Sequence, residues 1–394
     1  MRRLNTWLLA ATGAAVVVVS AAAAAGSSPT GSSPVTLACG QTVTTSVTLA
    51  SDLLNCPGNG LVIGAAGITI DLGGHTLSGS NAAKSAGITN NGHWNIAIVN
   101  GTITGFQRYG IVSRQAPGTT IRKVTIRAIG AGTKENEPAA GILLDHSPGS
   151  LVAQSDVTNH VHAYQADGVD VINSGRTGIV RNRLSRNAWN GLVVVQSSSS
   201  EVSGNQLDGN GNNGLEANAG SDGVFVSKNT AAHNKSWGIV VGALGQAKVI
   251  ANVVAGSGRD GFLFFDLLSS VVKGNRSSGN ATGFSLSGGQ HGSSLVRLLG
   301  NTASNNKHQG IWVNGQNAKS PADDNVVSGN RATRNGKEGG IVIDGTARRN
   351  TLRRNTANAN RGSGIMAVTG TIDAGGNRAR GNAHAPQCVG VACS

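Results

Sequence analysis

Aromatic, sulfur-containing and acidic residues are scarce in this chain of 394 residues. Phe, Trp and Tyr make up 3% of the sequence, and it holds four cysteines, two methionines, eight prolines and 19 acidic residues. So few aromatic side chains do not fill a wide globular core. No segment shows the 3.6-residue apolar period of an amphipathic helix, which excludes helical and leucine-rich repeats. The 58 glycines instead suit a narrow core with tight turns.

Asparagine recurs through the second half of the chain every 22–29 residues. A second asparagine follows five positions after most of the first ones, and Ser257 replaces it once. A period of this length is typical of a repeat protein. The first series is Asn182, Asn205, Asn229, Asn252, Asn275, Asn301, Asn330, Asn355 and Asn377, and the second is Asn187, Asn210, Asn234, Asn280, Asn306, Asn335, Asn360 and Asn382.

Short apolar alternations lie between these asparagines. Each begins after a glycine, as in Gly191-Leu-Val-Val and Gly238-Ile-Val-Val. A period of two, rich in β-branched residues, indicates strands. We therefore predict an all-β fold, a parallel β-helix formed by one solenoid of about 13 coils stacked about 4.8 Å apart. The corner asparagines should form side-chain amide ladders and adopt the left-handed backbone of sharp turns.

The N-terminus has the pattern of a secretory signal peptide at residues 1–25. Arg2 and Arg3 precede an apolar stretch, and Ala23-Ala24-Ala25 offers a small-residue cleavage site. A membrane anchor is the alternative, but no charged flank follows the apolar stretch. Residues 26–35 have the composition of a disordered leader. We expect a secreted, extracellular protein with no transmembrane anchor in the mature chain.

The four cysteines lie at the two ends of the predicted solenoid. An exported chain with an even number of cysteines predicts disulfides. Of the three possible pairings, only Cys39–Cys56 with Cys388–Cys393 avoids joining opposite ends of a rod. We therefore predict an N-terminal cap at 36–60, a β-helix at 61–384 and a C-terminal cap at 385–394. A zinc site is the weaker alternative, because the spacings match no common pattern.

The formal charge of the chain is +13, and removal of Arg2 and Arg3 with the signal peptide leaves +11. A field of this sign attracts anions such as uronate polymers or other cell-wall polymers. Nucleic acid is a poor candidate, because no aromatic residues alternate with the arginines. We expect a monomer whose partner is an acidic polysaccharide or cell-wall polymer.

Outward positions follow from the register, two and four places after each glycine. They bring Arg114, Asp145 and Asp170 onto successive coils, with Glu216 two coils later. Carboxylates and an arginine at this spacing suit a cation or the proton transfers of sugar chemistry. Asp145 and Asp170 are the candidate Ca²⁺ ligands, although no cofactor is required. Outward apolar residues form a stripe through Val193, Val240 and Phe265 that ends near Trp312.

Longer coils insert residues at 131–140, 158–167, 287–294 and 315–325, all beside the same predicted sheet. Insertions on one face of a solenoid often mark its binding side. The second insertion contains His160, His162, Tyr164 and Asp167, close to His146. The candidate catalytic residues are Arg114, Asp145, His146, His162, Tyr164 and Asp170, and the candidate substrate-binding residues are Glu216, Asn218, Phe265, Trp312 and Asn314.

Two segments, ITIDLGGHTLSG at 68–79 and IAIVNGTITGF at 96–106, resemble secreted right-handed parallel β-helix repeat proteins. That group includes pectate lyases, mannuronan C5-epimerases and alginate lyases, so the resemblance implies a right-handed β-helix and polysaccharide chemistry. The epimerase pattern Tyr-Gly-Phe-Asp-Pro-His corresponds here to Tyr109-Gly110-Ile111-Val112-Ser113-Arg114. Only its first two residues are kept, which argues against epimerase chemistry.

Two functions are compatible with the sequence. The first is an exported protein that binds an acidic polysaccharide and cleaves it by β-elimination, as a polysaccharide lyase or related carbohydrate-active enzyme. The second is a non-catalytic cell-surface binding or adhesion module. The sequence alone does not decide between binding and turnover.

Overall fold

The structure is a computed structural model of the chain that describes residues 33–131, 138–161, 165–315, 317 and 319–394. The predicted signal peptide and residues 26–32 of the predicted leader lie outside the described residues. Within the described ranges every regular element is a β-strand. Those ranges contain no helix long and apolar enough to cross a membrane.

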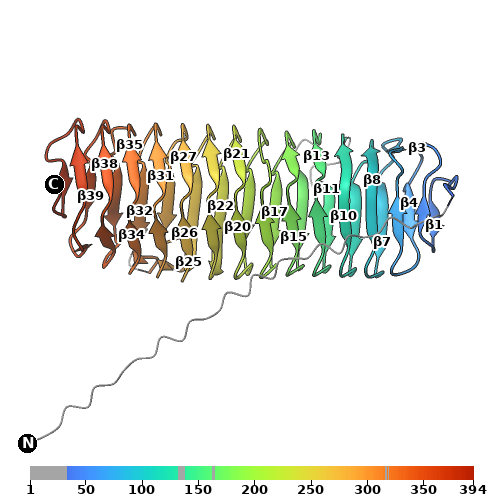
Figure 1. The fold of residues 1–394 in the computed structure, drawn as a ribbon, viewed down its shortest axis with the longest axis horizontal. Coiled ribbons are helices and arrows are strands. Elements are labelled where there is room, and N and C mark those ends of the chain that lie inside the picture. Colours follow the sequence, from blue (N-terminus) through green and yellow to red (C-terminus); the bar gives the residue numbers. More distant parts are fainter. Residues whose placement is uncertain (1–32, 132–137, 162–164, 316, 318) are drawn as a thin grey trace, which may run out of the picture.

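The strands wind into a single rod of stacked turns (Figure 1). Each strand pairs in parallel with the equivalent strand of the next turn, as β11 (Ala139–Asp145) does with β14 (Ala166–Ile172). The rod has about 14 turns. The predicted parallel β-helix is therefore confirmed, with nearly the predicted number of coils.

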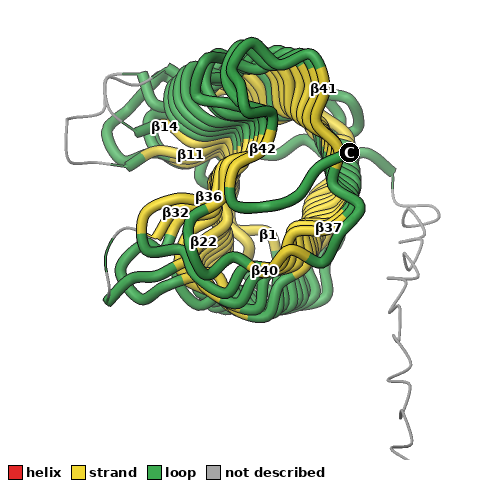
Figure 2. Tube along the Cα trace, turned by 90° about the vertical axis from the view of Figure 1, so that its left-hand side faces the viewer, coloured by secondary structure: helices red, strands yellow, loops and turns green. Residues whose placement is uncertain are grey.

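Seen along the rod, the strands form three faces around a narrow interior (Figure 2). Face one is the sheet of β1 (Gln41–Val43), β4 (Leu61–Ile63), β7 (Ala86–Asn91), β9 (Tyr109–Arg114), β11, β14, β17 (Leu192–Val195), β19 (Leu215–Asn218), β22 (Ile239–Gly245), β25 (Phe262–Leu268), β28 (Phe284–Ser287), β29 (Ser293–Ser294), β32 (Ile311–Gly315), β33 (Ala322–Asp323), β36 (Ile341–Gly345), β39 (Ile365–Ala367) and β42 (Cys388–Val389).

Faces two and three follow face one in each turn. Face two contains β2 (Val47–Thr48), β5 (Thr69–Asp71), β12 (Leu151–Ala153), β15 (Gly178–Val180), β18 (Glu201–Ser203), β20 (Phe225–Ser227), β23 (Lys248–Ile250), β26 (Val271–Lys273), β30 (Arg297–Leu299), β34 (Val326–Ser328), β37 (Thr351–Arg353) and β40 (Ile372–Asp373). Face three contains β3 (Leu53–Cys56), β6 (Thr76–Gly79), β13 (Asp156–Thr158), β16 (Arg183–Ser185), β21 (Thr230–Ala232), β24 (Val253–Ala255), β27 (Arg276–Ser278), β31 (Thr302–Ser304), β35 (Arg331–Thr333), β38 (Thr356–Asn358) and β41 (Arg378–Arg380). The long strands β8 (Ala97–Thr104) and β10 (Thr120–Arg127) bend round the corner and pair on both faces.

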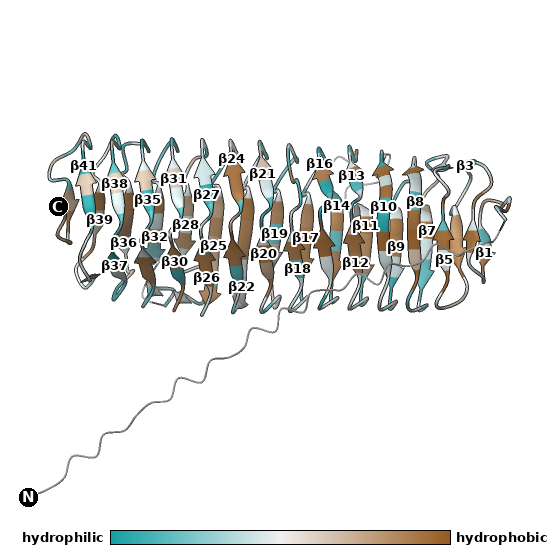
Figure 3. Cartoon of the chain, in the orientation of Figure 1, coloured by the Kyte–Doolittle hydropathy of each residue, from teal (hydrophilic) through white to brown (hydrophobic). Residues whose placement is uncertain are grey.

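The interior is a set of aliphatic and aromatic columns. Equivalent residues of successive turns pair directly, for example Leu192 with Leu215, and both are fully buried. Phe262 and Phe284 stack with their ring centroids 4.7 Å apart. Hydrophobic and hydrophilic residues both occur in the strands along the rod (Figure 3). The period-two pattern of the sequence thus fixes which side chains enter the core.

Buried asparagine ladders form two corners of the rod, as predicted. The side chain of Asn205 is typical: Nδ2 donates to Asn229 Oδ1 at 3.0 Å and to the Ile179 carbonyl at 2.7 Å. Its Oδ1 accepts from the backbone amide of Asn182 at 2.9 Å. Each amide therefore supplies hydrogen-bond partners to its neighbours, although Asn187 Oδ1, at the start of the second ladder, is buried without a partner.

The predicted left-handed backbone at the ladder asparagines is wrong. The residue before each ladder asparagine has the positive φ, as Arg181 (56°), Lys228 (55°) and Arg354 (51°) show. The turn is made by this preceding residue because the asparagine side chain must point inward to join its ladder.

Both ends of the rod are closed by the predicted disulfides. Cys39 pairs with Cys56 and Cys388 with Cys393, with Cα–Cα distances of 5.3 and 6.2 Å. At the C-terminal end, Gln387 Oε1 accepts from Asn382 Nδ2 at 2.8 Å and ends the second ladder. The caps thus cover terminal turns that lack a neighbour on one side.

The described parts of the four inserted segments border face one on its two sides (Figure 2). The segments at 131–140 and 158–167 precede β11 and β14, and those at 287–294 and 315–325 follow β28 and β32. Residues 132–137, 162–164, 316 and 318 of these segments lie outside the described residues.

Candidate functional site

The outward columns of face one have the predicted register. Arg114 lies opposite Asp145, and Asp145 lies opposite Ile172. Asp170 lies opposite Leu143 on one side and Val193 on the other. Val193 in turn pairs with Glu216, so two rungs separate the last two carboxylates. The structure therefore places these side chains on one side of the sheet.

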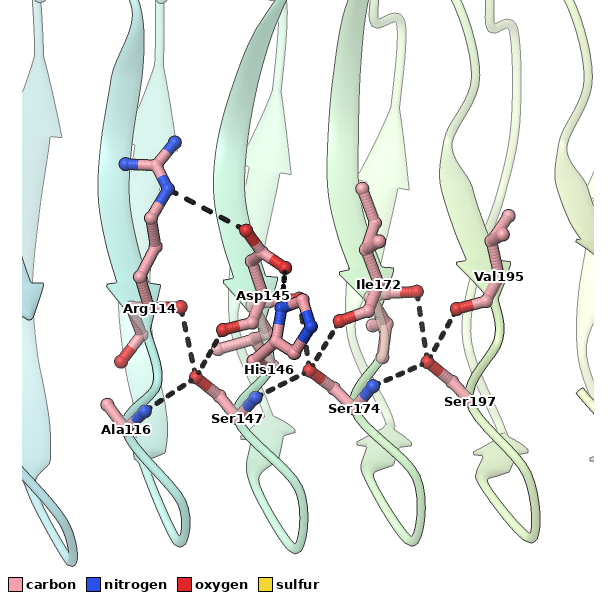
Figure 4. A network of polar contacts seen from close by, with 12 residues as sticks. Arg114, Ala116, Asp145, His146, Ser147, Ile172, Ser174, Val195 and Ser197 are labelled. Carbon is pink, nitrogen blue, oxygen red and sulfur yellow. Dashed lines mark hydrogen bonds and ion pairs between the residues drawn. The ribbon is translucent and has the colours of Figure 1, made fainter. Parts of the chain in front are cut away.

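Arg114, Asp145 and His146 form one polar cluster on neighbouring rungs (Figure 4). Arg114 Nε lies 3.8 Å from Asp145 Oδ2, and His146 Nδ1 lies 2.7 Å from Asp145 Oδ1. The side chain of His146 is 61% exposed. With Nδ1 donating to the carboxylate, His146 Nε2 is left as a basic nitrogen.

A serine ladder that sequence analysis did not detect fixes the corner beneath this cluster (Figure 4). The backbone amides of Ala116, Ser147 and Ser174 donate to Ser147, Ser174 and Ser197 Oγ at 3.1, 2.8 and 2.9 Å. His146 precedes the ladder with a φ of 49°. Its left-handed backbone turns the chain directly after Asp145 and holds the imidazole beside that carboxylate.

Tyr109 lies between two arginines on the outer side of face one. The guanidinium carbons of Arg108 and Arg114 lie 5.3 and 5.4 Å from the centre of its ring. The ring packs in a small outer apolar cluster with Val112 and Leu143, and Tyr109 is 6% exposed. Cation–π contacts of this kind hold guanidinium groups in place.

Arg108 Nε is buried and has no hydrogen-bond acceptor. A buried guanidinium N–H without a partner costs free energy that an incoming anion would recover. The guanidinium groups of Arg108 and Arg114 therefore make the surface around Tyr109 suited to binding a carboxylate or another anion.

Asp167 and Asp170 form a carboxyl pair on β14. Burial raises the pKa of Asp167 to about 7, although the Asn190 backbone amide donates to its Oδ1 at 2.7 Å. Burial and the nearby Asp167 carboxylate raise the pKa of Asp170 well above its usual range. Asp170 Oδ1 is buried without a partner. One proton is therefore held between the two carboxyl groups near neutral pH.

Glu216 is held by two asparagine amides. Asn218 Nδ2 donates to its Oε1 at 2.6 Å, and Asn213 Nδ2 donates to its Oε2 at 3.1 Å. Both Glu216 and Asn218 are half-buried. They form a polar strip two rungs from Asp170 with fixed acceptor positions.

The remaining predicted binding residues lie further along the same face. Phe265, Trp312 and Asn314 are half-buried, and the Phe265 ring lies over Gly242. The predicted exposed apolar stripe is wrong as a continuous surface, because Val240 is only 4% exposed and its neighbours are half-buried. Side chains on rungs this close shield one another from water.

Asp145 and Asp170 have different partners. Asp145 contacts Arg114 and His146, whereas Asp170 contacts Asp167. Among the described residues, no three His, Cys, Asp or Glu side chains are grouped as metal ligands. The donor set therefore gives little support to Ca²⁺, which stays a prediction, and no step below depends on it.

The second insertion contains two histidines and a tyrosine, of which the structure describes only His160. His162 and Tyr164 lie outside the described residues. His160 is 3% exposed, and its Nδ1 accepts from the Ile129 backbone amide at 3.4 Å. Burial lowers the pKa of His160 to about 3, so it is neutral. It anchors the insertion against the rod rather than offering an exposed acid or base.

Sequence reasoning missed the column of residues directly before each glycine of face one. Tyr109 pairs with Ala140, and Ala140 pairs with Asp167, all on the outer side. Strict alternation would place the residue before the glycine on the inner side, but the glycine itself faces the core, as the contact of Gly110 with Ile126 shows, so register alone does not identify this third outward column. The two arginines beside Tyr109 require coordinates.

A hollow of about 550 Å³ lies beside the later turns, lined by Asp222, Asp266 and His291 among others. The Asp266 carboxylate already accepts backbone amides from Gln290, His291 and Gly292 at 3.0, 2.6 and 3.1 Å. It holds the third insertion in place, which makes this hollow a structural feature of the loop.

Comparison with known proteins supports the architecture. The family described as "Right handed beta helix region" matches residues 133–266, 247–332 and 292–384. No curated protein sequence matches the chain significantly.

Three solved structures share the fold at low sequence identity. The periplasmic alginate epimerase AlgG has a TM-score of 0.52 and 14% identity over 86% of this chain and 78% of that one. The A-module of mannuronan C-5 epimerase AlgE4 from Azotobacter vinelandii has a TM-score of 0.51 and 14% identity over 90% and 91%. The catalytic unit of a GH87 α-1,3-glucanase from Streptomyces thermodiastaticus has a TM-score of 0.55 and 13% identity over 85% and 63%.

Proposed function

The chain belongs to the right-handed β-helix family, and from this premise we propose that it is an exported protein that binds an acidic polysaccharide across face one. The observation that carries the proposal is the pair of arginines at Tyr109. Arg108 has a buried N–H without an acceptor, and Arg114 lies on the same ring. A uronate carboxylate supplies the bidentate acceptor that guanidinium groups prefer.

The shape and charge of the molecule support a polymer as the ligand. Face one runs the length of the rod, and inserted segments border it near β11, β14, β28 and β32. The chain carries a formal charge of +13. Two disulfides fit an oxidising compartment outside the cytoplasm. The solved structures that share the fold include proteins whose names state action on alginate and α-1,3-glucan.

The same cluster suits β-elimination from a uronate. Arg108 and Arg114 would neutralise the carboxylate, which makes the adjacent C5 proton more acidic. His146 Nε2, held by Asp145, would accept that proton as the C4–O bond breaks and the C4=C5 double bond forms. The leaving oxygen must then take up a proton. His162 and Tyr164, outside the described residues, remain candidates for that donor.

Binding without turnover is the alternative, and burial favours it. Asp170 is 9% exposed and Tyr109 is 6% exposed, so neither reaches a polymer without movement of the surrounding segments. Of the candidate acids and bases in the described part of the chain, His146 is the most exposed. A cell-surface binding module therefore stays the second candidate.

The binding proposal is tested with oligosaccharides of galacturonate, mannuronate and hyaluronan, and with neutral dextran as a control. Calorimetry should show binding of an acidic oligosaccharide to the wild-type protein. The double variant Arg108→Gln/Arg114→Gln should bind at least about tenfold more weakly, the loss expected for charged hydrogen bonds. The control Arg122→Gln/Arg127→Gln removes the same charge from β10 and should retain binding. Equal losses in both variants would contradict a site at Tyr109.

Turnover is measured separately, from the ultraviolet absorbance of the unsaturated product. A signal that disappears in His146→Ala, while binding persists, would assign the lyase activity. No signal with any acidic polymer, together with retained binding, would leave the binding module as the function.

A further inference from the structure

The C-terminal half of face three carries exposed arginines at a regular spacing. Arg276, Arg331 and Arg378 occupy one column, in which Thr302 and Thr356 separate them. The arginines are exposed and the threonines half-buried. Equivalent residues of neighbouring rungs are about 4.8 Å apart, so successive arginines lie roughly 9–10 Å apart along a straight line.

More arginines flank this column on the same face and its corners. Together they form what we call the arginine track: Arg276, Arg331, Arg334, Arg354, Arg378 and Arg380. No acidic residue occurs in the face-three strands and corners that carry them, at 274–280, 300–306, 329–335, 354–360 and 376–382. The strands of this region are pale to teal in Figure 3.

The charges of the arginine track are not neutralised within the described part of the chain. The arginines that form ion pairs there are Arg114, Arg183 and Arg349. Arg331 Nε donates to Thr333 on its own strand at 3.3 Å, and Arg334 Nε donates to Asn305 at 3.1 Å. These neutral contacts orient the side chains and leave their charge uncompensated.

The alternation of arginine and threonine reduces the cost of gathering these charges. Like charges directly opposite on adjacent strands are destabilising. A threonine between two arginines doubles their separation and adds a hydroxyl to the surface. The column thus presents cations on every second rung and hydrogen-bonding groups between them.

We propose that the arginine track is a second binding surface, specific for a linear acidic polysaccharide whose anionic groups recur about every two rungs. A rung is about as long as one sugar unit of an extended chain, so this spacing fits a polymer with one acidic group per disaccharide. Charge complementarity, the straight column and its hydroxyls select this occupant. The surface lies on face three, away from face one in Figure 2, so it extends the proposed function to a separate site.

The triple variant Arg276→Gln/Arg331→Gln/Arg378→Gln tests the proposal. Hyaluronan, with one carboxylate per disaccharide, is the probe, and polygalacturonate, poly(glycerol phosphate) and dextran are compared with it. The matched control Arg127→Gln/Lys248→Gln/Arg297→Gln removes the same charge from exposed positions outside the track. Melting temperature and circular dichroism establish that both variants fold.

The track variant should bind hyaluronan about tenfold more weakly than the wild type, with a shallower dependence on salt, whereas the control should change little. Equal weakening in both variants would show that only net charge matters and would overturn the proposal. Tighter binding of poly(glycerol phosphate) than of either polysaccharide would also overturn it.

The face-one variant Arg108→Gln/Arg114→Gln separates the two sites. Loss of binding in that variant alone would refute the arginine track and leave the proposed function intact. Loss in the track variant alone would establish the track and contradict the site at Tyr109.

Discussion

At the scale of single residues, the corner amides explain why asparagine recurs so regularly. Asn229 accepts from the amides of Asn205 and donates to Asn252 Oδ1 at 3.0 Å and to the Val202 carbonyl at 2.9 Å. No other side chain of this size supplies both two donors and a two-lone-pair acceptor. The ladder is thus a buried polar network in which every member is needed.

Ser257 interrupts the second ladder and offers a test of this account. Its Oγ is buried without a partner between Asn234 and Asn280. Ser257→Asn should restore the ladder and stabilise the protein by about 1 kcal/mol, the net value of a typical hydrogen bond. Asn229→Ala is the opposite change and should destabilise the protein by about 2–4 kcal/mol. It would leave buried hydrogen-bonding groups of Asn205, Asn252 and Val202 without their partner. Denaturant unfolding measures both, and a less stable Ser257→Asn variant would show that the corner has no room for the amide.

The Asp167–Asp170 pair predicts how stability depends on pH. The pKa of Asp167 is about 7 in the folded chain and that of an unfolded Asp is about 3.9. Between these values the folded state holds more protons than the unfolded state, so stability falls as pH rises through this window. Asp170→Asn removes one charge of the pair. It should raise the melting temperature at about pH 8 and leave it nearly unchanged at about pH 4. A variant less stable than wild type at the higher pH would contradict a shared proton.

The outward positions of Arg114, Asp145, Asp170 and Glu216 were predictable from the sequence, because strand register depends only on the period-two pattern. The burial of Asp170 and His160 was not predictable. It depends on how the inserted segments fold over the sheet, and those segments have no repeat to align.

At the scale of elements, face one near β9 differs from the rest of the sheet. Tyr109, Val112 and Leu143 build a second apolar cluster on the outer side, separate from the core inside the rod. This cluster holds Tyr109 firmly enough to position the two arginines. In the sequence Tyr109 belongs only to an incomplete motif, since one isolated aromatic residue gives no periodic signal.

Substitution of Tyr109 distinguishes a positioning role from a chemical one. Tyr109→Phe keeps the ring and should leave polysaccharide binding nearly unchanged. Tyr109→Ala removes the cation–π contacts, worth about 0.5–2 kcal/mol each, and should weaken binding about tenfold. Calorimetry with an acidic oligosaccharide gives both values. A large loss in Tyr109→Phe would show instead that the hydroxyl itself contacts the ligand.

At the scale of the whole molecule, stability is nearly a sum over neighbouring turns, so the ends are the weakest parts. The disulfides Cys39–Cys56 and Cys388–Cys393 each span a short loop in a terminal turn. Their position was predictable from the sequence, because a rod brings only local cysteines together. The polymer that the rod binds was not predictable, since fold does not determine ligand.

Reduction of the disulfides should destabilise the end turns before the middle. Each bridge is expected to contribute about 2–3 kcal/mol to its terminal turn. Hydrogen exchange after reduction should therefore increase at 36–60 and 385–394, with the central turns near Asn229 still protected. Uniform loss of protection along the rod would contradict independent end caps.

The site at Tyr109 is tested most directly by a crystal structure of the protein with a uronate oligosaccharide bound. The account predicts a sugar carboxylate hydrogen-bonded to the guanidinium groups of Arg108 and Arg114, with His146 beside the same sugar ring. An oligosaccharide bound only elsewhere on the rod, with Arg108 and Arg114 free of contacts to it, would contradict the account.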